Sequence, residues 1–307
     1  MKSKILVFLL VSSFMLVGAT SSAFAAPVDV YLGGPGPDSY PDYFRDAEKN
    51  KFAADDPYCW AASASNVLAW TGWDAGFSDE DAIFSNFQTN WTAAGSWARF
   101  GWEWWFTGSV TSDTAWNFSQ TDGWSTYTGG GGYYSQAQYN TNVMLWEDLS
   151  ATPDLSVADD KIMEFIDGNY ATGLSILRYL PTGNKGHGIT LWGYRYDDET
   201  GDIIGIHVSD SDSRESEWPP GTPLNDLDYY DLTFNTTYNC WYLSGYTDYD
   251  WWISSMGGLL PYDEEPGLEP GPGPGPGEPV PEPATIFLLG SGLAGLFGIG
   301  RRKFKRS

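Results

Sequence analysis

The chain has 307 residues, of which 40 are acidic and 16 are basic, and its formal net charge is −24. Between residues 27 and 280 there are nine basic residues against 39 acidic ones, a net charge of about −30. Such a surface repels nucleic acid and anionic lipid, and nucleic-acid binding is excluded. Aromatic residues make up 17% of the chain, which suits either a large core or flat binding surfaces for sugars or peptides.

Residues 1–26 have the pattern of a secretory signal peptide. Lys2 and Lys4 precede the apolar run ILVFLLVSSFMLV, and small residues ending at Ala26 form a cleavage site. We therefore expect the mature protein to begin near Pro27.

Residues 263–280 contain the spacer PGLEPGPGPGPGEPV, whose Pro/Gly composition predicts an extended linker that buries no core. The chain between the signal peptide and this linker, residues 27–262, is long enough for one domain with a substantial core.

Residues 281–307 combine Pro281-Glu282-Pro283, an apolar stretch at 284–300 and the basic tail RRKFKR. The apolar stretch just crosses a hydrocarbon core as a helix, and its basic flank is expected in the cytoplasm. The segment resembles PEP-CTERM sorting signals, which implies processing by an exosortase-type transpeptidase in the envelope of bacteria that make exopolysaccharide. The alternative is a plain C-terminal membrane anchor, and both place the domain outside the cytoplasmic membrane.

The folded region shows helical patterns first and strand patterns second. Apolar spacings predict a helix over residues 59–70, and SDEDAIFSNFQTNW predicts another that Ser78 caps. Residues 95–140, rich in Gly, Ser, Thr and aromatics, are expected to form a mobile surface stretch beside a substrate groove. An amphipathic helix at SVADDKIMEFIDGNY and three β-rich runs over 173–213 follow, which predicts an antiparallel sheet and an α+β fold class.

Cys59 is the candidate nucleophile. It follows a polar turn in which Asp55 and Asp56 occupy the positions of helix caps, and a helix N-terminus favours the thiolate form of a cysteine. A disulfide to Cys240 would remove this nucleophile. The context of Cys59 favours a free thiol, with Cys240 as a small buried side chain in the strand-like NCWYLSGY.

The candidate base is one of two histidines. His187 opens a strand after the loop PTGNKG, at an accessible edge position. Strand alternation places Asp210 and Asp212 on one face and His207 on the other, so His207 is expected outside the site. One of the two carboxylates can accept the Nδ1–H of His187 and fix its tautomer. Taken alone, the DSDS cluster also suits a solvated turn or a Ca²⁺-binding loop.

Three blocks in this order, DDPYCWAASASN, HGITLWG and VSDSDS, resemble the Ide/Mac-type cysteine endopeptidases of papain-like fold. The resemblance implies an N-terminal helix that carries the nucleophile and packs on an antiparallel β-sheet that carries the histidine and aspartate. It also implies five site residues: Cys59 as nucleophile, His187 as base, Asp210 as its orienting acid, Asp212 beside it, and Lys49 as an oxyanion-site donor.

The resemblance predicts an exported cysteine endopeptidase that cleaves peptide bonds of a protein or peptide substrate through a thioester and needs no metal or organic cofactor. Lys51 is the alternative to Lys49 at the oxyanion site. Two further hypotheses stay open. One is a non-catalytic envelope or exopolysaccharide-matrix protein that binds glycan through its aromatic side chains. The other is a transpeptidase or amide hydrolase that uses the same site.

Overall fold

The computed structural model describes residues 26–34, 44–47, 49, 56–111, 125–147, 154–178, 185–212, 227–246 and 250–263. The helices are the 3₁₀ turn η1 (Asp56–Tyr58), α1 (Cys59–Thr71), α2 (Glu80–Asn90), α3 (Ala98–Thr107), α4 (Gln136–Asn142) and α5 (Ala158–Asp167).

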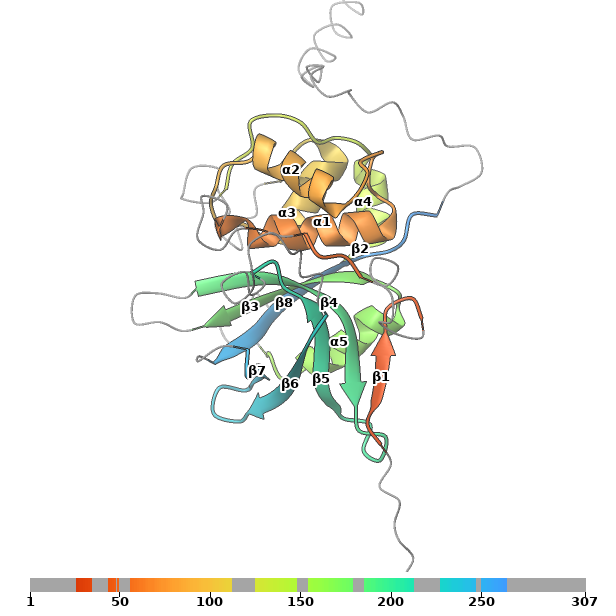
Figure 1. Cartoon of the computed structure of the whole chain (residues 1–307), viewed down its shortest axis with the longest axis vertical. Helices are drawn as coiled ribbons and strands as arrows, with labels where there is room; N and C mark the ends of the chain where they lie inside the picture. The colour runs from red at the N-terminus through yellow and green to blue at the C-terminus, as the bar shows by residue number, and fades with distance from the viewer. Residues whose placement is uncertain are drawn as a thin grey trace, which may run out of the picture.

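The strands form one sheet in which every hydrogen-bonded pair of neighbouring strands is antiparallel. They are β1 (Val28–Tyr31), β2 (Val143–Glu147), β3 (Ala171–Arg178), β4 (Lys185–Tyr196), β5 (Ile203–Ser209), β6 (Asp228–Asn235), β7 (Cys240–Ser244) and β8 (Trp251–Leu259). Helices α1 to α4 gather on one side of the strands, and α5 packs against β3, β4 and β7 (Figure 1).

The predicted papain-like α+β fold, with a helix packed on an antiparallel sheet, is wrong, because the sheet closes on itself. The strand order runs β4-β3-β8-β7-β6-β5, and β5 pairs with β4 again, which makes a closed six-stranded barrel. β1 adds to β4 and β2 adds to β8 outside this ring. β4 is twelve residues long, and its residues 185–191 pair with β3, residues 190–196 with β5 and residues 193–196 with β1.

Irregular pairing curves the barrel. The register shifts between Leu191 and Gly193 where β4 meets β5, and between Ser175 and Ile176 where β3 meets β8. Bulges of this kind bend a strand and increase its twist, which closure of a small barrel requires. The β-rich runs of the sequence predict β3, β4 and β5, whereas closure also needs β6 to β8 and the pairing of β8 with β3, which lies much earlier in the chain.

The aromatic middle of the chain is core, and the expected mobile surface stretch over 95–140 is wrong for α3. Trp102, Trp104 and Trp105 on this helix are fully buried. The indole N–H of Trp102 donates to the Ala64 carbonyl at 3.2 Å, which attaches α3 to α1. Residues 112–124 of the stretch lie outside the described residues.

The helix starts differ from the predicted caps. α1 has Tyr58 at its N-cap position and no side-chain cap hydrogen bond, while Asp55 lies outside the described residues. The N-cap of α2 is Asp79, which accepts from the Ala82 amide at 2.8 Å, and Ser78 only donates to Asp79. The first turn of α1 is thus left without a capping side chain.

Two glycines let α1 lie directly on the barrel. A Cβ on Gly188 of β4 would stand 3.2 Å from the Cα of Trp60, and one on Gly173 of β3 would stand 3.2 Å from the Ser63 hydroxyl. Both distances are shorter than ordinary van der Waals contact. The helix can therefore lie this close to the strands because positions 173 and 188 have no side chain. The backbone of β4 therefore touches the beginning of α1.

We predict that Gly188→Ala lowers the free energy of unfolding by about 1–3 kcal/mol, because the added methyl group must push β4 away from α1. Denaturant unfolding measures this loss. Gly129→Ala is the control, since a Cβ at Gly129 would meet nothing within 4 Å. Equal stabilities of the two variants would show that the contact between β4 and α1 is not tight.

Candidate active site

Cys59 is the first residue of α1 and is partly buried. The thiol lies close enough to the His187 side chain and to the Gly188 backbone for both to lower its pKa. Because Gly188 lies against the first turn of α1, the same contact that joins helix and barrel also places the thiol beside the histidine.

His187 is held between the thiol and a carboxylate. It lies on β4 opposite Ile176 of β3, and its side chain is 8% exposed, so the expected accessible position is wrong. Its Nε2 lies 2.7 Å from Oδ1 of Asp210. The predicted contact of the carboxylate with Nδ1 is wrong, because Nε2 binds Asp210 and Nδ1 is the ring nitrogen left for Cys59.

Asp210 follows the end of β5 and is surrounded by donors. Its Oδ1 also accepts from the Asp212 amide at 3.0 Å, and its Oδ2 accepts from the Tyr246 hydroxyl at 2.5 Å. Burial raises the pKa of Asp210, but the charge and hydrogen bond of His187, then Tyr246 and the Asp212 amide, lower it to about 2. Asp210 is therefore a carboxylate at neutral pH and stabilises a positive charge on His187.

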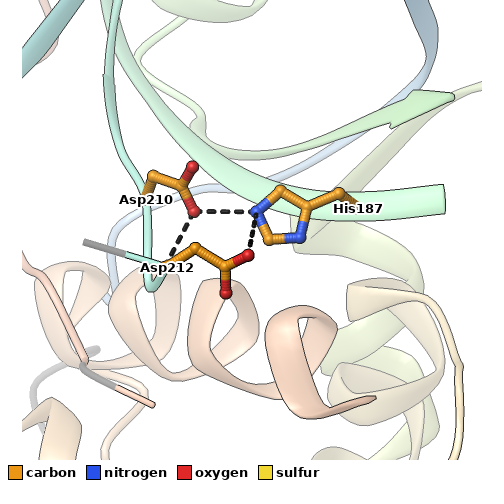
Figure 2. Close-up of side chains that lie close together, drawn as sticks. All are labelled: His187, Asp210 and Asp212. Carbon is orange, nitrogen blue, oxygen red and sulfur yellow. Dashed lines mark hydrogen bonds and ion pairs between the residues drawn. The ribbon is translucent and has the colours of Figure 1, made fainter. Parts of the chain in front are cut away.

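Asp212 and Lys49 form a second charged pair beside the first. Figure 2 shows the Asp212 carboxylate next to the imidazole, with Oδ2 4.0 Å from Nε2 of His187. The Lys49 ammonium contacts the other oxygen of Asp212, and the Lys49 side chain is 1% exposed. Lys49 thus enters the site through an ion pair, while Lys51 lies outside the described residues.

The thiol and the imidazole shift each other's protonation. Burial raises the pKa of Cys59, but the charge and hydrogen bond of His187 lower it. The Gly188 backbone and the Lys49 charge lower it further, so the pKa of the thiol lies below its ordinary value. Burial lowers the pKa of His187, but Asp210 and Cys59 raise it well above its ordinary value. These directions favour a thiolate–imidazolium pair.

Buried polar side chains fix how α1 lies on the barrel beneath the site. The Ser63 hydroxyl donates to the Ile189 carbonyl at 2.9 Å. The Asn66 amide donates to Thr190 at 3.1 Å and to Ser209 at 3.4 Å, on β4 and β5. Asn66 belongs to the motif around Cys59, but the motif alone does not indicate this role.

Tyr246 is a site residue that sequence reasoning missed. Its ring lies 6.3 Å from the His187 ring and 5.7 Å from Trp251, and its hydroxyl is bound to Asp210. It follows β7, more than 30 residues after Asp210 in the sequence, and nothing in the segment YLSGY marks it. Only closure of the barrel brings β7 to this place.

A cavity of about 730 Å³ opens at these side chains. It lies between α1 and the segment 95–98 on one side and β3 and β4 on the other. Cys59, His187 and Lys49 all line it. This volume is typical of a ligand-binding cleft.

The other cysteine and the other histidine lie elsewhere. Cys240 is a free thiol buried on β7, and burial raises its pKa. Cys59 is free as well, so no disulfide joins the two. His207 lies on β5 with Nε2 2.8 Å from Oδ1 of Asp29, which also binds Arg195.

Three side chains of the site also have the chemistry of metal ligands. One ligand atom each of His187, Asp210 and Asp212 lies within 4.8 Å of the others. The Lys49 ammonium already contacts Asp212, and the His187 nitrogen already meets Asp210. A cation would have to displace both partners to bind here.

The comparisons identify the C-terminal segment. The PEP-CTERM protein-sorting motif matches residues 279–303. The chain therefore carries a signal for export through an exosortase and for membrane anchoring by its C-terminal segment. A search of curated proteins finds no match to the chain. The comparisons give no support to the resemblance to Ide/Mac-type peptidases.

Within the described residues no helix is both long and apolar enough to cross a membrane. The predicted membrane segment at 284–300 lies outside those residues.

We predict that iodoacetamide modifies Cys59 rapidly at pH 6, because its pKa is lowered, and leaves Cys240 unmodified. His187→Ala removes the main group that lowers the pKa of Cys59, and the rate at pH 6 should fall at least about ten-fold. Peptide mapping by mass spectrometry gives both rates. Equally slow modification of the two cysteines would contradict a thiolate–imidazolium pair.

We predict that Tyr246→Phe lowers the free energy of unfolding by about 1.5–3 kcal/mol, because Asp210 loses a hydrogen bond to a charged group. The pH midpoint of Cys59 alkylation should rise, since a less firmly held Asp210 stabilises the imidazolium less. Tyr229→Phe, which removes a Tyr–Asp hydrogen bond of 3.0 Å to Asp231, is the matched control. A midpoint shifted equally by both variants would rule out a specific role for Tyr246.

Proposed function

We propose that the chain is an exported cysteine endopeptidase, sorted to the cell envelope by its PEP-CTERM segment. The observation that carries the proposal is the order of contacts from Cys59 through His187 to Asp210, with 2.7 Å between the last two. The proposal includes a signal peptide over 1–26 and a single catalytic domain over 27–262. It does not include a papain-like fold, since the barrel differs from one.

The proposed reaction has two acyl-transfer steps. The Cys59 thiolate attacks a peptide carbonyl carbon, and the resulting oxyanion collapses as the C–N bond breaks. His187 gives its proton to the leaving amine, and the acyl group remains on sulfur as a thioester. His187 then takes a proton from water, the hydroxide attacks the thioester, and the thiolate returns as the carboxylic acid leaves.

The first turn of α1 is suited to stabilise the oxyanion. The N-cap residue Tyr58 makes no side-chain hydrogen bond to its N–H groups, and the helix dipole favours negative charge there. Lys49 lines the same cavity and can add a positive charge, although its ammonium also has to neutralise Asp212. Asp210 supports the reaction indirectly, because it orients His187 and stabilises the imidazolium form.

The glycan-binding hypothesis has less support from the described residues. Most aromatic side chains of the described residues lie in the core. The large hydrophobic side chains that are exposed among these residues are Leu145 and Tyr238. A flat exposed aromatic platform for sugar is therefore not evident among them. A transpeptidase or amide hydrolase would use the same chemistry and differ in the group that receives the acyl chain.

We predict that the purified full-length chain cleaves a denatured protein mixture and that Cys59→Ala lowers the rate by at least about 10³-fold. The new N-termini are counted by mass spectrometry. Cys240→Ala should retain activity, since that thiol lies outside the site. Cleavage that survives in Cys59→Ala would refute the mechanism. Absence of cleavage by a protein whose Cys59 is rapidly alkylated would point to another acyl acceptor.

A further inference from the structure

The cavity holds an unusual share of the positive charge of the chain. Lys49, Arg178 and Lys185 line it, although residues 27–280 contain just nine basic side chains. Lys49 is bound to Asp212, and Asp210 is bound to His187. Arg178, Lys185 and Asp228 line the same cavity.

Arg178 and Lys185 face each other across two strands. Arg178 ends β3, Lys185 begins β4, and the two are direct register partners. Directly opposite residues of antiparallel strands point to the same face, and like charges in this arrangement destabilise the sheet. Such a pair concentrates positive charge on one face of the cavity, where an anionic group of a ligand can bind.

The pair is adjacent to the proposed base. Ile176 and His187 are the register partners two positions further along the same strands, so His187 shares a face with the two cations. The Arg178 guanidinium lies 5.1 Å from the centre of the Trp251 ring, and that ring lies 6.1 Å from the His187 ring. One aromatic ring therefore separates the Arg178 cation from the imidazole.

We propose that Arg178 and Lys185 form a carboxylate-binding subsite, and that the preferred substrate is a peptide with an acidic group close to the bond that is cut. The inference rests on the proposed function, since it names the substrate class of the same cavity. A guanidinium binds a carboxylate through two parallel hydrogen bonds, and the ammonium opposite it adds a third donor. The strong negative charge of the whole chain would otherwise repel such a substrate.

The test separates binding from cleavage. Cys59→Ala full-length protein is equilibrated with synthetic decapeptide pools that carry either Glu or Gln at each varied position. The pools have acetylated N-termini and either free or amidated C-termini. We expect the Glu pool to bind about ten-fold more tightly than the Gln pool, and the preference to disappear with Lys185→Gln.

Lys185 is exposed, so its substitution should not affect folding, and Arg178→Lys retains the charge while removing the two-pronged donor. Lys161→Gln is the control, because Lys161 is paired with Glu164 on α5 and does not line the cavity. Equal binding of the two pools, or a preference that Lys185→Gln leaves intact, overturns the subsite. Dependence on a free C-terminus identifies a terminal carboxylate, and independence of it identifies an acidic side chain.

Wild-type protein is then incubated with the same pools, and the products are sequenced. Both proposals are supported if the wild-type protein cuts near acidic residues and the Lys185→Gln variant loses this preference. Selective binding without any cleavage supports the subsite and refutes the peptidase. Cleavage without an acidic preference refutes the subsite and leaves the peptidase standing.

Discussion

The contact between Gly188 of β4 and the first turn of α1 is the constraint on which the site depends. A helix that begins with a thiol is ordinary, and so is a strand that carries a histidine. Their side chains come together because the strand lies so close to the helix that a Cβ on Gly188 would stand 3.2–3.4 Å from backbone atoms of Trp60 and Cys59. Only glycine permits that approach, so one missing side chain determines the geometry of two others.

If apolar side chains alone held α1 against the barrel, the helix could slide along the strands. Hydrogen bonds have direction, and those of Ser63 and Asn66 to β4 and β5 accept only one position of the helix. Asn66 also accepts from the Ala47 amide at 2.6 Å, which holds the segment before Lys49. The same buried network thus positions the thiol, the histidine strand and the segment that carries the cation.

The local parts of this arrangement follow from the sequence. The start of α1 at Cys59 follows from the turn and the helical spacing around it, and the position of Asp210 near His187 agrees with strand alternation. Barrel closure does not follow, because it depends on the long-range pairing of β3 with β8 and on bulges whose registers have no local signal. The position of Tyr246 in the site depends on that closure. The burial of α3 does not follow from its sequence either, because tryptophan residues alone do not indicate whether they lie in the core or at the surface.

The charges of the site have to be understood against the acidic chain around them. A thiolate and two carboxylates within one cavity repel one another, and the imidazolium and the Lys49 ammonium offset that repulsion. Each cation touches a carboxylate, His187 at Asp210 and Lys49 at Asp212, so neither is free to neutralise the thiolate alone. A negative charge on the Cys59 sulfur would lie at the N-terminus of α1, where the helix dipole stabilises it. An attacking thiolate and the oxyanion that follows it need the same stabilisation, and a single helix start can supply both.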